Sequence, residues 1–92
     1  MKQVLCMLNG EELMDTEAQP LTLGRVLSDV LIYDTKTKIG ALRALELARK
    51  VYTADTVDME AADVDLLRRA IEHQERYNNL VMGQAMEALV GA

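Results

Sequence analysis

The stretch at residues 22–33, TLGRVLSDVLIY, sets the fold, because one face of it is apolar at every helical turn. Thr22 stands directly before the apolar positions, and a threonine there can accept a hydrogen bond from a free N–H group of the first helical turn. We expect a helix over 22–33 that buries one stripe of side chains. The stripe consists of Leu23, Val26, Leu27, Val30 and Leu31.

Residues 37–54 predict a second helix, with one charged side and one apolar side. At about 100° per residue its charges fall within an arc of roughly 140°; they are Lys38, Arg43, Glu46, Arg49 and Lys50. The opposite side holds Ala41, Ala44, Leu45, Leu47, Ala48, Val51 and Tyr52. Ile39 and Leu42 lie on the charged arc, and the amphipathic pattern does not account for them.

Two more helices are predicted, over 59–77 and 79–90. The first has an inner face of Val64, Leu67, Ala70, Ile71 and Gln74. The second is apolar nearly all round, a pattern typical of a helix buried on most sides. A chain this small has hardly enough material to bury it, so we expect it to pack in the core or against a second copy. The predicted interface residues are Leu80, Met82, Met86 and Val90.

The N-terminal residues 3–14 predict a short β-hairpin. Asn9-Gly10 is a strong hairpin signal, because both residues tolerate the positive φ angles that a tight turn requires. The chain has 92 residues, which favours one domain over 1–92. The predicted fold class is α+β, mostly α, with this hairpin packed on about four helices.

Composition excludes several classes of function. No apolar run reaches the roughly 18 residues that a membrane helix needs, and the start of the chain lacks a signal-peptide pattern. The net charge of −5 argues against general binding to nucleic acid. Cys6 and His73 are the only cysteine and histidine. They give no metal-ligand spacing and no nucleophile–base pair. We therefore expect a cytoplasmic protein that is not an enzyme and has no cofactor or metal.

Five acids stand close together without a base among them: Asp55, Asp58, Glu60, Asp63 and Asp65. A calcium loop is one interpretation, but the glycine that such a loop needs at its sixth position is missing. The alternative is that acids gather at a helix N-terminus, where the helix dipole favours negative charge. We prefer the second interpretation.

The basic side chains of the second helix also have two interpretations. Arg43, Arg49 and Lys50 could hold a nucleotide-like anion, since guanidinium groups pair well with phosphate. However, Glu46 lies among them, and no glycine-rich loop precedes the helix. A solvated face is therefore the favoured interpretation, and the anion site remains an alternative.

The order of segments resembles small proteins encoded by tailed bacteriophages and prophages. The resemblance covers most of the chain. It is carried by the turn at Asn9-Gly10, by residues 21–27 and 44–52, by Val57-Asp58-Met59, and by residues 77–84. It implies a setting, the cytoplasm of a bacterial host, but it gives no residue a catalytic or binding role.

Three functions follow as hypotheses. The first is a non-enzymatic interaction protein that binds and inhibits a host protein, with a protein of a defence system as one candidate. The second is an oligomer that sequesters a nucleotide-like anion on Arg43, Arg49 and Lys50. The third is a factor in the assembly of the virion tail or head. We also expect a homo-oligomer formed through the last helix.

Overall fold

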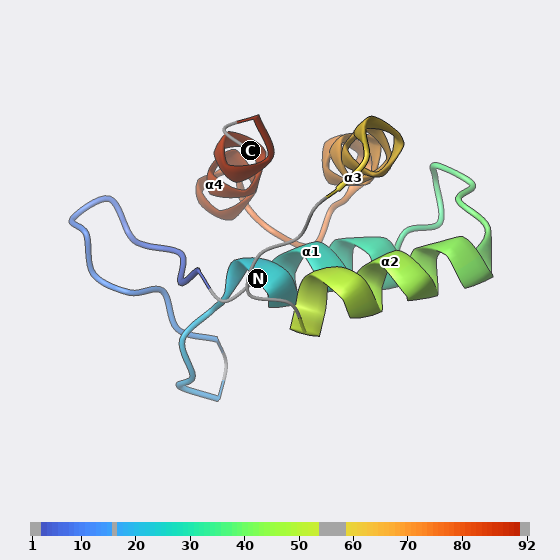
Figure 1. The fold of residues 1–92 in the computed structure, drawn as a ribbon. Helices are drawn as coiled ribbons and strands as arrows, with labels where there is room; N and C mark the ends of the chain where they lie inside the picture. Colours follow the sequence, from blue (N-terminus) through green and yellow to red (C-terminus); the bar gives the residue numbers. More distant parts are fainter. Residues whose placement is uncertain (1–2, 16, 54–58, 91–92) are drawn as a thin grey trace.

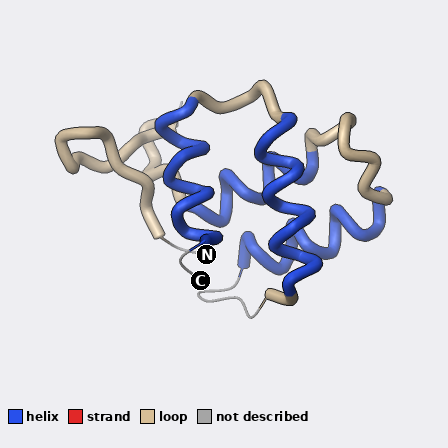
Figure 2. Tube along the Cα trace, turned by 90° about the horizontal axis from the view of Figure 1, so that it is seen from above, coloured by secondary structure: helices blue, strands red, loops and turns tan. Residues whose placement is uncertain are grey.

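The computed structural model describes residues 3–15, 17–53 and 59–90 and contains four helices over these ranges. They are α1 (Leu23–Ile32), α2 (Ala41–Thr53), α3 (Ala61–His73) and α4 (Asn79–Val90). Helices α1 and α2 lie side by side and run in opposite directions (Figure 1). Helices α3 and α4 form a second layer that crosses the first at a steep angle, as Figures 1 and 2 show.

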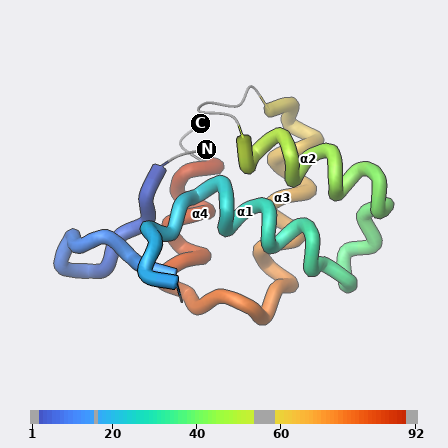
Figure 3. The backbone as a smooth tube through the Cα atoms, turned by 90° about the horizontal axis from the view of Figure 1, so that it is seen from below, coloured from blue at the N-terminus to red at the C-terminus, as the bar shows by residue number. Residues whose placement is uncertain are grey.

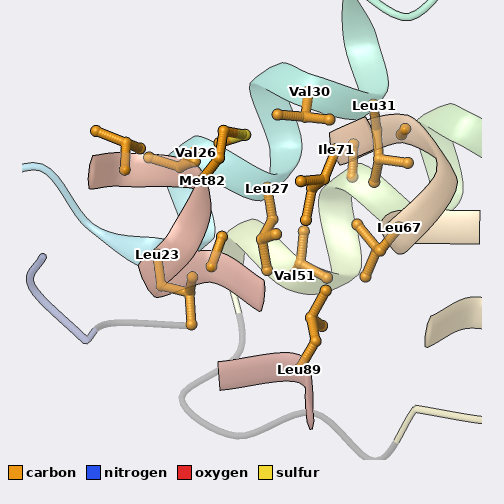
Figure 4. Packing of buried hydrophobic residues seen from close by; sticks show 14 of the residues in the cluster. Leu23, Val26, Leu27, Val30, Leu31, Val51, Leu67, Ile71, Met82 and Leu89 are labelled. Carbon is orange, nitrogen blue, oxygen red and sulfur yellow. The ribbon is translucent and has the colours of Figure 1, made fainter. Parts of the chain in front are cut away.

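Helix α1 is the centre of the fold. It packs against each of the other three helices, and only Arg25, Asp29 and Ile32 of its residues are not buried. Figure 4 shows what surrounds it: Val51 of α2, Leu67 and Ile71 of α3, and Met82 and Leu89 of α4. Thr22 caps its N-terminus by accepting a hydrogen bond from the Arg25 N–H group (3.3 Å). The helical character of the chain that the apolar spacing predicted is therefore confirmed.

The prediction of an N-terminal β-hairpin, and with it the α+β class, is wrong. The described residues contain no strand and no sheet, and the chain is all-helical over them. The chain does reverse at Asn9-Gly10, with Gly10 at φ +89° and a hydrogen bond from its N–H group to the Met7 carbonyl (2.9 Å). The turn chemistry was therefore recognised, but the strands that should flank the turn do not form.

The reason lies in a ring of three backbone hydrogen bonds. The Leu5 N–H group donates to the Leu21 carbonyl (2.9 Å), Leu21 donates to Leu13 (2.8 Å), and Leu13 donates to Leu5 (2.8 Å). The three segments around these leucines pair antiparallel in all three combinations, each through a single bridge. Three strands of one sheet cannot be mutually antiparallel, since two neighbours of a third strand run parallel to each other. The segments must therefore cross as the sides of a triangle.

Helix α2 begins later than predicted and helix α3 ends earlier, and the local conformation of the chain explains both differences. Helix α2 begins at Ala41 and not at 37, because Lys38 has φ +56°, which a right-handed helix does not accept. Helix α3 ends at His73 and not at 77, because Gln74 is extended. The Gln74 side-chain oxygen accepts hydrogen bonds from the N–H groups of Arg76 (2.8 Å) and Tyr77 (2.7 Å). Gln74 therefore closes the loop between α3 and α4 and does not continue the helix.

A matched pair of leucine substitutions tests this arrangement. Leu27 is fully buried in α1, so Leu27→Ala should lower the free energy of unfolding by about 3 kcal/mol, through lost burial and the cavity it leaves. Leu42 is 71% exposed on α2, so Leu42→Ala should change it by less than about 0.5 kcal/mol. Urea unfolding followed by circular dichroism measures both. A large loss from Leu42→Ala would contradict the placement of α2.

Candidate functional site

The side of α2 that faces away from α1 carries a second line of apolar residues. Leu42, Leu45 and Tyr52 are 71%, 39% and 59% exposed. Together with Arg49 they follow the spacing i, i+3, i+7, i+10, which places all four side chains on one face of the helix. We call these four residues the outer stripe. Because Leu47, Ala48 and Val51 of the same helix are buried in the core, α2 is apolar on two sides.

The outer stripe was only partly visible in the sequence. The charge arc had placed Leu42 on the polar side, where the structure indeed leaves it exposed. Leu45 and Tyr52 were expected on the apolar side of the helix, but they face solvent. The cause is that α2 packs mainly on one neighbour, α1, and a single helix covers only a narrow stripe of its partner.

Asp63, in the first turn of α3, binds two of the predicted anion-site residues. Its carboxylate, only 6% exposed, pairs with the Arg43 guanidinium and lies 3.8 Å from the Lys50 Nζ. Of the trio Arg43, Arg49 and Lys50, only Arg49 belongs to the outer stripe. The structure therefore divides the predicted anion site, because the chain's own carboxylate pairs with Arg43 and lies near Lys50, and its single negative charge offsets one of the three positive charges. No signal in the sequence pointed to this pairing.

The predicted interface on α4 is also divided. Met82 is buried in the core, and Met86 is half-buried against it. Both line a hollow of about 420 Å³ between α3 and α4, together with Ile71. Leu80 lies on the other side of α4, next to Met7 and Leu8, and the side chain of Val90 lies outside the described residues. Self-association through α4 stays a prediction, but Met82 stabilises the single chain.

The side chain of Gln84 holds the N-terminal segment against α4. Its oxygen accepts from the Cys6 N–H group (2.8 Å), and its nitrogen donates to the Cys6 carbonyl (2.7 Å) and to the Leu80 carbonyl (3.0 Å). The amide thus pairs with both backbone groups of Cys6, as a neighbouring strand would. Gln84, a polar residue in a mostly apolar helix, therefore has a structural role that periodicity could not indicate.

A polar seam joins the loop between α1 and α2 to the loop between α3 and α4, beside a hollow of about 330 Å³. The Tyr77 hydroxyl donates to Asp29 Oδ2 (2.6 Å), and the Arg76 guanidinium lies 4.2 Å from the centre of the Tyr33 ring. Lys36 pairs with Glu75 (2.6 Å), and the Lys36 ammonium holds the pKa of Glu75 below its usual value. Each of these groups already has a partner within the chain. The seam therefore connects the two loops to each other and to α1.

Asp34 organises the loop that leads into this seam. It accepts hydrogen bonds from the N–H groups of Lys36 (3.2 Å) and Thr37 (3.3 Å), and from the Thr37 hydroxyl. Burial raises the pKa of Asp34, but these hydrogen bonds outweigh it and leave the pKa below the usual value. His73 lines the same hollow and is exposed.

The acidic residues give no metal centre within the part of the chain that the structure describes. Asp55 and Asp58 lie outside it, Glu60 is the N-cap residue of α3, and Asp63 forms an ion pair with Arg43. Asp65 pairs with Arg69 one turn later (2.9 Å). No group of three or more histidine, cysteine, aspartate or glutamate residues that could hold a metal ion occurs among the described residues. Nor does any described helix have the length and hydropathy to cross a membrane.

Comparison with known proteins adds no relative to these observations. No protein-family model, no curated protein and no solved structure matches the chain. The outer stripe of α2 is therefore the candidate site on physical grounds: it is where the described chain leaves large apolar side chains exposed along one helix, with a base among them.

The environment of Tyr77 in the seam leads to a prediction about the stability of the protein at alkaline pH. Burial, and then Asp29, raise the pKa of Tyr77 from 10 to about 12. Between these values the unfolded chain loses the phenolic proton and the folded chain keeps it, so the free energy of unfolding falls as pH rises from 10 to 12. Tyr77→Phe should flatten this fall. At pH 7 it should cost about 1 kcal/mol through the lost hydrogen bond.

Urea midpoints measured at neutral and alkaline pH test this expectation. Tyr52→Phe is the matched control, because it removes an exposed phenol on α2 and leaves Tyr77 in place. An alkaline fall as steep in Tyr77→Phe as in the parent would contradict the assignment.

Proposed function

We propose that the protein is a non-enzymatic interaction protein, and that it binds a protein partner through the outer stripe of α2. The observation that carries this proposal is the exposure of Leu42, Leu45 and Tyr52 in one line, on a helix that already buries its opposite side. Aromatic, leucine and arginine side chains grouped on an exposed helical face are typical of protein-binding surfaces. Scattered single apolar residues would need no such explanation.

The charge around the stripe indicates the chemistry of the partner. Residues 36–53 contain five bases and one acid, a net charge of +4 within a chain whose total is −5. Arg49 lies in the stripe itself. A segment that fits this face therefore carries apolar side chains flanked by acidic ones, since complementary charge speeds association and excludes basic competitors.

In the phage setting that the sequence resembles, the partner is a host protein that this chain inhibits. The site favours a macromolecule over the alternative of a sequestered nucleotide-like anion, because Asp63 already neutralises Arg43 and lies near Lys50. An anion bound there would have to compete with a carboxylate fixed in the same fold.

Paired pull-downs and titrations test the proposal. The parent, Arg49→Glu and Leu42→Ser would be used as bait for a bacterial lysate, and a protein retained by the parent would then be purified and titrated directly. We expect both substitutions to weaken its binding at least about tenfold, as centrally placed contacts do, and added salt to weaken the parent's binding.

Arg68→Glu is the matched control, because it makes the same charge change at an exposed position on α3. It should leave binding unchanged. A partner that binds Arg49→Glu and Leu42→Ser as tightly as the parent would contradict the assignment to the outer stripe.

A further inference from the structure

The N-terminal segment has the charge pattern opposite to that of α2. Residues 3–24 contain four acids and no base, a net charge of −4. Of these acids, Glu11, Glu12 and Glu17 are exposed, whereas Asp15 pairs with Arg25. The chain therefore separates its charges between two segments, an acidic one before α1 and a basic one through α2.

The acidic segment also exposes large apolar side chains. Leu8 stands at the turn and is 96% exposed, and Met7 beside it is 45% exposed. Leu8 and Met7 line a shallow hollow beside α4 together with Leu80. Met7, Leu8, Glu11 and Glu12 thus form an apolar point with acids next to it, which we call the acidic tip. The acidic tip therefore has the properties inferred above for a partner of the outer stripe, namely apolar side chains flanked by acidic ones.

The two surfaces lie on opposite sides of the molecule. Figure 1 shows the N-terminal segment projecting from one side of the helical body, with α2 on the other side, and Figure 3 shows the same separation from below. The tip is held in this position by the Gln84 amide and by the ring of backbone hydrogen bonds through Leu5. A chain therefore cannot fold its own tip onto its own outer stripe.

We propose that the acidic tip of one copy docks on the outer stripe of a second copy. Leu8 and Met7 cover Leu42, Leu45 and Tyr52, while Glu11 and Glu12 lie against Arg49. This proposal rests on the proposed function, and it names a second copy of this chain as a partner of the same site. A symmetric contact of α2 with α2 is disfavoured, because it would bring two Arg49 side chains and two segments of net charge +4 together.

The assembly is head-to-tail. A contact between different surfaces on opposite sides leaves one tip and one stripe free in every pair, so copies add in a row or close into a ring. A contact made by a few side chains on each copy is expected to be weak and transient.

Two complementary variants test the proposal. The stripe variant carries Leu42→Ser, Arg49→Ser and Tyr52→Ser, and the tip variant carries Leu8→Ser, Glu11→Ser and Glu12→Ser; all six positions are exposed. Sedimentation velocity over micromolar to millimolar concentration should show the parent forming species larger than dimers. Each variant alone should remain monomeric, with an unchanged circular dichroism spectrum. An equal mixture should form a one-to-one dimer and nothing larger, since only one tip and one stripe remain to meet.

A parent that stays monomeric at millimolar concentration overturns the inference, and so does a tip variant that associates as well as the parent. Either result leaves the proposed function open to its own test. If the stripe variant loses an outside partner while the parent is monomeric, the stripe is a binding site but a second copy is not its ligand. If the stripe variant self-associates like the parent and also binds the outside partner as tightly as the parent does, both proposals fail.

Discussion

The burial of α1 on nearly all sides is the constraint on which the rest of the structure depends. A ten-residue helix with seven buried residues needs neighbours on most of its circumference, and α2, α3, α4 and the N-terminal segment supply them. Because α2 is used to cover one side of α1, only one narrow face of α2 enters the core. The exposure of Leu42, Leu45 and Tyr52 follows from this arrangement, since no other helix among the described residues covers that face of α2.

The same constraint explains the path of residues 3–15 and 17–21. Leu5 and Leu21 are buried, so two segments separated by a long reversal must both reach the core. A hairpin over residues 3–14 does not include Leu21, whereas the triangle of three crossing segments brings both leucines inward and pairs their backbone groups. The amide of Gln84 then ties the segment to α4, so that the tip around Leu8 projects from a fixed base.

The apolar spacing predicted the helices, which depend on local periodicity. It did not predict the path of the N-terminal segment or the exposed face of α2, which depend on how the elements pack together. Leu23, Val26, Leu27, Val30 and Leu31 follow a helical period, and they are buried in a helix. The turn at Asn9-Gly10 could also be predicted from the sequence. The absence of strands beside the turn could not be predicted, because backbone pairing there depends on the position of Leu21, which no local pattern encodes. The candidate site was missed for a similar reason: Leu45 and Tyr52 fit an inner face on any helical wheel, and only the number of neighbours around α2 shows that they lie outside it.

The net charge of −5 conceals the feature that bears most on function. A segment of −4 and a segment of +4 cancel in the total, and the other residues supply the net −5. The two segments nevertheless lie on opposite sides of one small body, each beside exposed leucine. Evenly mixed surface charges would give two copies of such a protein little electrostatic attraction for each other. Separated charges give it two unlike ends, and attraction between unlike ends increases as salt falls. Because Asp63 pairs with Arg43, the buried acid lowers the positive charge next to the stripe and leaves Arg49 as its central base. In the docking that we propose at that face, the apolar residues supply contact area and Arg49 sets the register, a division that a uniformly basic helix would not provide.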